Sequence, residues 1–235
     1  MSTISGIGGG YNSSNLYGKI ASGNRIQRAA DDAAGMAIAS KMEAQSRSLN
    51  MQARNASEQR AALNVADGGR SGISDYLQDI SELSIQAMNG TMSASDKQII
   101  QNQINQYTQG IADTVHQTKY NETYMLSGTS AESLGMAGYN VTAENFNLDD
   151  VSSALSSVNA SRSQDGAMTN GLSSNISNLQ STAENTTAAM SRISDLDIGK
   201  ASTELKKEQA LQQYSAAMQK RQMDDQQSLM AKMFA

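Results

Sequence analysis

Apolar residues recur at helical spacing over most of this chain, in two long stretches that flank a different middle. Residues 20–118 and 148–235 carry apolar side chains every three or four positions, which is the period of an amphipathic helix. The chain contains no proline, so no helix loses a backbone donor or suffers a ring clash. We therefore predict a mainly α fold, in which both chain ends build a long antiparallel helical coiled-coil rod.

The first stretch predicts two helices with a short break between them. A heptad seam runs to about residue 88; its members are Ala62, Ala66, Gly69, Ile73, Tyr76, Ile80, Leu83 and Ala87. Its first half is small, so a partner backbone is expected to approach closely there. Asn89-Gly90 should end this helix, with the glycine supplying a positive φ. Ser95 is expected to cap the next helix, whose apolar stripe is Ile100, Ile104, Tyr107, Ile111 and Val115.

Residues 119–147 differ from both flanks, because glycine and tyrosine replace the helical pattern. Tyr120 and Tyr124 precede Ser127-Gly128, and two more glycines lie close to the run Tyr139-Asn140-Val141-Thr142. This composition is typical of one or two short hairpins. We predict a small β-hairpin insert over this range.

Helical spacing returns at Leu148 and continues to the end of the chain. A second seam consists of Leu172, Ile176, Leu179, Ala183, Thr186, Met190 and Ile193. It is able to pair antiparallel with the first seam. A break near 197–199 should precede a last helix, with Leu205, Leu211, Tyr214, Met218, Leu229, Met230 and Met233 as its large apolar residues. That helix ends in an apolar tip, Met233-Phe234.

The first 24 residues are rich in Gly, Ser and Asn, and Gly8-Gly9-Gly10 disfavours a helix locally. A short helix is expected over 12–21. Asp31 and Asp32 then precede an Ala- and Met-rich run, which is typical of a helix start. We interpret this acid pair as structural, with Arg25 or Arg28 as its partner.

Composition limits the size of the core and the choice of partners. Aromatic residues make up 4% of the 235 residues and tryptophan is absent, which favours narrow helix–helix seams over a thick core. The net charge of −5 argues against a nucleic-acid partner. No apolar run approaches the ~18 residues that a membrane helix needs. The start of the chain does not resemble a secretory signal peptide, so export would use a route that cleaves none.

Residue types for catalysis are scarce. His116 is the only histidine and cysteine is absent, so neither a zinc-protease motif nor a Ser-His-Asp set is available. The run Gly6 to Gly10 lacks the Lys-Ser/Thr of a phosphate loop. The methionines are interpreted as seam fillers. We predict no catalytic residue, no metal site and no cofactor.

Four groups of residues resemble signatures of one family. Residues 21–39 contain Ser22-Gly23-Asn24-Arg25-Ile26 and Asp31-Asp32-Ala33-Ala34-Gly35, and closely resemble the N-terminal signature of bacterial flagellins. Residues 83–91 resemble the second signature, and 117–121 with 126–128 resemble the turn after it. Residues 191–197 and 211–218 resemble the C-terminal signature. The four groups follow one another in the family's order and together are specific.

The resemblance implies a structural subunit that self-assembles into the bacterial flagellar filament for motility. It implies inner terminal helices, called D0, over 1–24 and 199–235, and a D1 rod over 25–118 and 148–198. The insert at 119–147 leaves no room for outer domains. The leader before Ser22 is shorter than usual by about a dozen residues, roughly 18 Å of helix, so the inner N-terminal helix should be short. Two alternatives are a hook–filament junction protein, which shares the terminal helices, and a cytosolic coiled-coil scaffold.

The resemblance also implies partners and site residues. The partners are other copies of the chain, the flagellar cap, the junction proteins and the export chaperone, and the location is extracellular. We expect the following residues to serve the seams and self-assembly: Arg25, Asp31, Asp32, Ile73, Ile80, Leu83, Leu172, Ile176, Leu179, Met190, Leu211, Met218, Leu229 and Phe234.

A host Toll-like receptor is a further partner that the resemblance implies. Strongly immunostimulatory flagellins carry arginines where this chain has Asp79 and Ser81, and a glutamate where it has Gln103. Glu82 and Leu83 are retained. Because arginine often supplies directed contacts at interfaces, we expect activation of this receptor to be weak.

Overall fold

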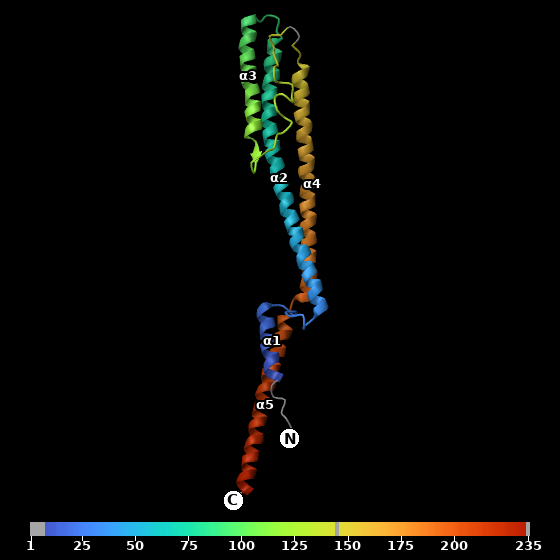
Figure 1. Cartoon of the computed structure of the whole chain (residues 1–235), viewed down its shortest axis with the longest axis vertical. Coiled ribbons are helices and arrows are strands. Elements are labelled where there is room, and N and C mark those ends of the chain that lie inside the picture. The colour runs from blue at the N-terminus through green and yellow to red at the C-terminus, as the bar shows by residue number, and fades with distance from the viewer. Residues whose placement is uncertain (1–7, 144–145, 234–235) are drawn as a thin grey trace. The chain divides into compact units, whose positions relative to one another are not determined.

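In the part of the chain that the computed structural model describes, residues 8–143 and 146–233, five α-helices and one two-stranded hairpin follow one another (Figure 1). They are α1 (Gly8–Ser22), α2 (Ala33–Ala87), α3 (Ala94–Gln117), β1 (Lys119–Tyr120), β2 (Thr123–Tyr124), α4 (Asp149–Ser194) and α5 (Ile198–Met233). The prediction of a mainly α fold is confirmed. The helices form two compact units, a central unit, Leu49–Ser181, and a terminal unit of the described residues up to Ser48 and from Thr182 onward.

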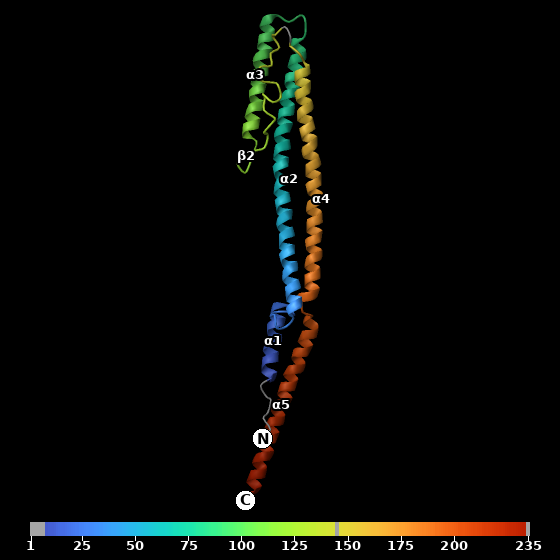
Figure 2. The same ribbon diagram turned by 45° about the vertical axis from the view of Figure 1, so that its right-hand side comes forward.

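In the central unit, α2, α3 and α4 lie side by side (Figures 1 and 2). Helix α4 runs antiparallel to α2, because residues that advance along α2 contact residues that recede along α4. Arg60 Nη1 donates to Ser173 Oγ at 3.4 Å, and Arg162 Nε donates to Asp67 Oδ1 at 2.9 Å. Helices α2 and α4 therefore pair antiparallel, but the two predicted seams do not face each other. Leu172, the first residue of the second seam, lies beside Ala62, the first residue of the first seam, so the two seams extend from there in opposite directions.

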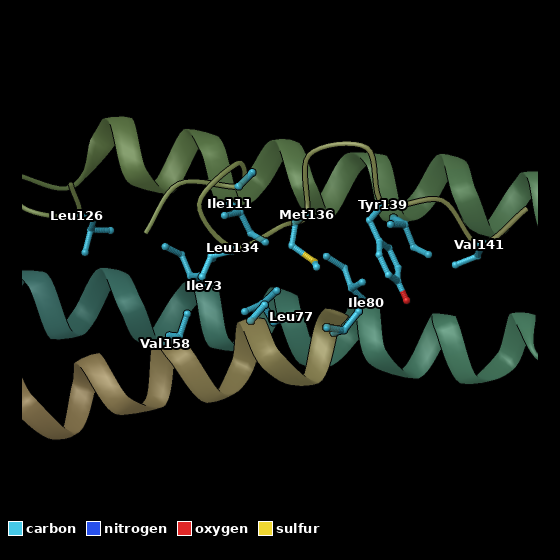
Figure 3. Packing of buried hydrophobic residues seen from close by; sticks show 14 of the residues in the cluster. Ile73, Leu77, Ile80, Ile111, Leu126, Leu134, Met136, Tyr139, Val141 and Val158 are labelled. Atoms are coloured by element: carbon cyan, nitrogen blue, oxygen red, sulfur yellow. The ribbon is translucent and has the colours of Figure 1, made fainter. Parts of the chain in front are cut away.

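The larger half of the first seam is the centre of the core. Ile73 and Ile80 are fully buried, and so is Leu77 between them. Figure 3 shows these side chains facing α3 and the segment that follows the hairpin on one side and α4 on the other. In the smaller half, side chains come close to Gly69, whereas the prediction was close approach of a partner backbone. A Cβ on Gly69 would lie 2.6 Å from Thr118 Oγ1 and 2.8 Å from Leu126 Cδ1, so only glycine admits these neighbours.

Of the one or two hairpins predicted for 119–147, the first forms. Lys119 pairs with Tyr124 and Tyr120 with Thr123. The turn residues Asn121 and Glu122 have φ values of 47° and 65°, the conformation that two-residue hairpins favour.

No second hairpin forms in the described residues after Tyr124. Gly128, Gly135 and Gly138 all have positive φ and divide this segment into turns. Its apolar side chains therefore do not alternate between two faces, as a strand requires. Those that enter the core are Leu126, Ala131, Leu134, Met136, Tyr139 and Val141 (Figure 3).

Buried polar side chains tie this irregular segment to the helices. Gln101 on α3 accepts a hydrogen bond from Val141 N at 2.7 Å and donates one to Tyr139 O at 2.9 Å. The Tyr139 hydroxyl donates to Ser84 Oγ at 3.0 Å, and Ser84 donates to Ile80 O at 2.6 Å. Burial raises the pKa of Tyr139, which favours the protonated hydroxyl as the donor. These bonds satisfy backbone groups that no sheet or helix satisfies.

The connection between α2 and α3 corrects two expectations. Gly90 is not among the residues with positive φ. Instead, Asn89 Oδ1 accepts hydrogen bonds from Thr91 N at 3.2 Å and Thr91 Oγ1 at 3.0 Å, and thereby organises the turn. The cap of α3 is Ser93, not Ser95. Ser93 and Asp96 form a reciprocal capping box, and Ser95 already lies inside the helix.

In the terminal unit, α1 lies alongside α5 (Figures 1 and 2). The helix α1 begins at Gly8, so the expected start at residue 12 is wrong and the glycine run does not stop the helix, because intrinsic propensity is only a weak prior. The first turns of α2 and the last turns of α4 also belong to this unit. They meet where Ser46 Oγ and Thr187 Oγ1 lie 3.0 Å apart.

The pair Arg70–Asp165 on α2 and α4 generates a prediction. The two side chains are hydrogen-bonded, and only 13% and 9% exposed. Asp165→Ala leaves a guanidinium buried without its partner and should destabilise the protein by roughly 3 kcal/mol or more in urea denaturation. The control is Asp67→Ala, which breaks the neighbouring pair with Arg162, where the side chains are 46% and 35% exposed; its loss should be below about 1 kcal/mol. Equal losses in the two variants would contradict the prediction.

Candidate assembly surfaces

The turn between α1 and α2, residues 23–32, is joined to the end of α4 by backbone hydrogen bonds. Leu196 N donates to Gly23 O at 2.8 Å, and Arg25 N donates to Ser194 O at 2.7 Å. They flank an antiparallel bridge between Asn24 and Asp195. Gly23 has a φ of +72°, which any side chain would strain. A short β-like contact thus joins the segment after α1 to the segment after α4.

Arg25 and Asp32 stabilise the start of α2. Arg25 donates from its guanidinium to Ile193 O at 2.8 Å, and the same nitrogen lies 3.6 Å from Asp32 Oδ2. Asp32 Oδ1 accepts the Gly35 N–H at 2.8 Å, which is the bond of a helix N-cap. The expected arginine partner is therefore found for Asp32.

Asp31 has a different partner from the one expected. Its carboxylate accepts from Lys19 Nζ at 2.8 Å, and from the N–H groups of Gln27 and Arg28 at 3.1 Å. The Lys19 bond first, and then the two backbone bonds, lower the pKa of Asp31 to about 2. Asp31 therefore fastens α1, which carries Lys19, to the turn before α2. The expectation of an arginine partner for this residue is wrong.

The last helix leaves most of its apolar residues uncovered. Leu211, Met218 and Leu229 are 57%, 40% and 62% exposed. Gln209 Nε2 donates to the Tyr17 hydroxyl, which sets α1 against α5. Length explains the exposure of Leu229, because α1 has 15 residues and α5 has 36, or roughly 22 Å against 54 Å of helix. Leu211 lies beside Asn15 and Leu16 of α1 at a surface hollow, and α1 leaves it more than half exposed. Phe234, at the expected apolar tip, lies outside the described residues.

The remaining seam residues divide into buried and half-buried groups. Ile73, Ile80 and Ile176 are buried within the chain. Leu83 packs partly buried against the core, and Leu179 is also half-buried. Met190 helps to line a cavity of about 310 Å³ in the terminal unit, together with Ile26 and Met36. These residues build the two units and leave little surface to a neighbour.

An apolar groove on the central unit is the exception. It is open, about 500 Å³ in volume, and lies between α2 and α4 beside the segment after the hairpin. Leu172 lines it, and so do Leu63, Met125 and the exposed Met168. Two predicted seam residues of the central unit, Leu172 and Ala62, thus lie at a surface hollow.

The structure brings Asp79, Leu83 and Gln103 to adjoining parts of α2 and α3. The rings of Tyr76 and Tyr107 join the two helices, with centroids 5.9 Å apart. Asp79 lies three residues after Tyr76 and Gln103 four before Tyr107, so each is a neighbour of its tyrosine on the helix surface. Asp79 and Gln103 are exposed. These residues form a continuous surface that another protein can reach.

The sequence interpretation missed the charged pairs between α2 and α4. Arg70 on α2 pairs with Asp165 on α4, and Asp67 on α2 pairs with Arg162 on α4. The order of the charges alone would place like charges opposite each other in an antiparallel pair, so the sequence pattern did not identify these partners.

The structure also reports on metals and membranes. His116 lies edge-on to Tyr124, with ring centroids 6.2 Å apart. Among residues 8–143 and 146–233, no group of His, Asp or Glu side chains is arranged to hold a metal ion. No described helix is long and apolar enough to span a membrane.

The lowered pKa of Asp31 generates a prediction about acid stability. A pKa of about 2 against an ordinary value of 3.8 means that the ionised carboxylate stabilises the folded state. This contribution is complete above the ordinary value and is lost as the pH falls through about 2. Melting temperatures measured against pH should therefore show the parent above Asp31→Asn near neutrality, with the difference shrinking in that acid window. A difference that stays constant down to the lowest pH would contradict this assignment.

Most of the chain is similar to known proteins. The family model for the bacterial flagellin N-terminal helical region matches residues 11–131, and the model for the C-terminal helical region matches residues 148–232. A flagellin of Halalkalibacterium halodurans is 31% identical, with 85% of this chain and 84% of that protein covered. The flagellar filament 33 kDa core protein of Treponema phagedenis and the flagellin of Bacillus subtilis are each 30% identical, with 85% of this chain covered and 85% and 86% of those proteins.

One solved structure bears on the fold alone. The crystal structure of Bacillus cereus flagellin has a TM-score of 0.50 and 23% identity, and covers 58% of this chain and 94% of that chain. The two family models together span most of the chain and leave residues 132–147 between them, with the hairpin inside the N-terminal match. The sequence signatures, the mainly α fold and these matches agree, and the chain belongs to the bacterial flagellin family.

Proposed function

We propose that this protein is a structural subunit that polymerises into the bacterial flagellar filament. The observation that carries the proposal is the uncovered apolar surface of α5, in a chain whose relatives are named as flagellins and flagellar filament core proteins. Leu211, Met218 and Leu229 would be covered by other copies of the chain. Large exposed apolar surfaces of this kind mark interaction sites.

The geometry of the contact between subunits explains how such a chain forms a long polymer. A contact between two different surfaces of identical subunits does not close on itself unless the rotation returns to the start, so it generates an open helical polymer. The exposed face of α5 supplies one surface. The groove lined by Met168 and Leu172 is suited to be another. In this role the protein needs no catalytic group, and we propose that it is not an enzyme.

We propose inner segments at 1–24 and 199–235, and an outer segment at 25–118 and 148–198 with the insert 119–147. These limits follow the breaks between helices, at the turn 23–32 and between Ser194 and Ile198. The compact units divide instead inside α2 and α4. The ion pair of Lys19 and Asp31 crosses the limit between residues 24 and 25, and fastens α1 to the start of the outer segment.

Location and further partners follow from the filament role. The protein would be extracellular, exported without cleavage of a signal peptide. Its partners would be other subunits, the flagellar cap, the junction proteins and an export chaperone. An uncovered helix such as α5 is what a chaperone would shield before assembly, because it exposes Tyr214, Met223 and Met230 as well.

Removal of most of α5 tests the proposal. A chain that ends at Leu205 keeps α1 to α4 and loses the exposed apolar residues from Leu211 to Met230. It should remain a helical monomer by circular dichroism and should form no filaments in electron microscopy, under conditions where the full chain does.

A matched control separates apolar contact from helix loss. Replacing Leu211 and Leu229 by Gln keeps the length of α5 and should weaken filament formation without lowering helicity. Filaments of normal length from the shortened chain would overturn the proposal.

We further propose that the Asp79 surface is sensed weakly by the host Toll-like receptor for flagellin. An aspartate where stimulatory flagellins have an arginine reverses the charge that a receptor acid would meet, and Gln103 removes a second charge. The half-buried Leu83 can still supply apolar contact.

Asp79→Arg should therefore raise receptor signalling by monomer, measured as a shift of the dose response in reporter cells. Glu58→Arg is the control, because it makes the same change of charge on an exposed residue of α2 about 30 Å further along the helix. The proposal fails if the parent is already as potent as a strongly stimulatory flagellin, or if both variants gain equally.

A further inference from the structure

The chain contains two Asn-Gly dipeptides in different backbone settings. Asn89-Gly90 lies in the connection between α2 and α3, and Asn170-Gly171 lies inside α4. Both asparagine side chains are exposed, so water reaches both. The two dipeptides are identical, whereas the following residue, Thr91 or Leu172, and the backbone setting differ.

We propose that Asn89 is a site of spontaneous deamidation and that Asn170 is protected from the same reaction. The backbone nitrogen of Gly90 loses its proton to solvent and attacks Cγ of Asn89. A new C–N bond forms, the bond from Cγ to the side-chain nitrogen breaks, and that nitrogen leaves as ammonia after taking a proton. The product is a five-membered succinimide. Water then opens one of its two C–N bonds, which leaves either aspartate or an isoaspartyl linkage at position 89.

The setting of Asn89 favours the first step. Its Oδ1 accepts two hydrogen bonds from Thr91, at 3.2 Å from the backbone nitrogen and 3.0 Å from the hydroxyl. Donors aimed at this oxygen stabilise the negative charge that it gains as the nitrogen attacks. They also hold the carboxamide against the following residues.

The attacking group is also unhindered. Nothing lies within 4 Å of the place where a Cβ of Gly90 would be. Among the hydrogen bonds of the described residues, none is donated by the Gly90 N–H, so no bond has to break before that nitrogen reacts.

The setting of Asn170 opposes the same step. It lies within α4, a helix of 46 residues. Inside an α-helix, the N–H of Gly171 is donated to the carbonyl four residues earlier, and its φ and ψ are held in the helical range. Ring closure therefore requires local opening of the helix in the middle of its length, where opening is rarer than at an end.

The reaction would change the end of the central unit. A carboxylate at position 89 places negative charge just after the last turn of α2, where the helix dipole is also negative. An isoaspartyl linkage adds one carbon to the main chain. It would disturb the hydrogen bond from Met92 N to Asn89 O, which is 3.1 Å long, directly before the capping box of Ser93 and Asp96.

The test is to age the full-length protein in mildly alkaline buffer and to map aspartate and isoaspartate by peptide mass spectrometry. Products at position 89 should accumulate about tenfold faster, or more, than products at position 170. In concentrated urea, where both dipeptides have lost their backbone settings, the two rates should become similar.

Two variants provide the controls. Gly90→Ala adds a methyl group that meets no neighbour, at a residue without positive φ, so the fold is retained while the reaction at position 89 slows. Gly171→Ala should leave the rates of product formation at both positions unchanged in the folded protein. It should slow the reaction at position 170 only in urea. The proposal is overturned if positions 89 and 170 react equally in the folded protein, or if position 89 reacts only in urea.

Discussion

Burial of one face of α2 is the interaction on which the central unit depends. Ile73, Leu77 and Ile80 are fully removed from water, and each such side chain contributes about 1.5–3 kcal/mol. A chain with no tryptophan and two phenylalanines has few other large groups to bury. Helix α3, helix α4 and the irregular segment after the hairpin all take positions that cover this face (Figure 3).

Apolar contact of this kind does not by itself select one alignment of the helices, because aliphatic side chains can pack in several registers. Directed polar contacts make the selection. The pair Arg70–Asp165 allows one alignment of α4 on α2, since any other would leave two charges without partners. Gln101 has the same effect on the irregular segment, because both ends of its amide are bonded to the backbone near Tyr139 and Val141.

The terminal unit combines a firmly bonded turn with an uncovered helix. Gly23, Arg25, Asp31 and Asp32 take part in backbone and ionic bonds around the turn 23–32, whereas Leu229 on α5 stays in water. The free energy that burial of such residues would release is available only to a neighbouring chain. The same physical effect that folds the central unit would therefore drive assembly through the terminal one.

The sequence alone determined the helices, because their apolar spacing is a local property that survives any tertiary arrangement. It predicted α2, α3, α4 and α5 and the family, and it placed Ile73 and Ile80 on a seam. Other features depended on residues far apart in the chain. The partner of Asp31 is Lys19, because the turn returns α1 to that point. The segment from Leu126 to Val141 forms turns and not a second hairpin, because three glycines with positive φ direct its apolar side chains into a space between helices. Asn89-Gly90 and Asn170-Gly171 are identical as dipeptides, and only the fold places one in a turn and the other in a helix, because backbone conformation is decided by the whole packed unit.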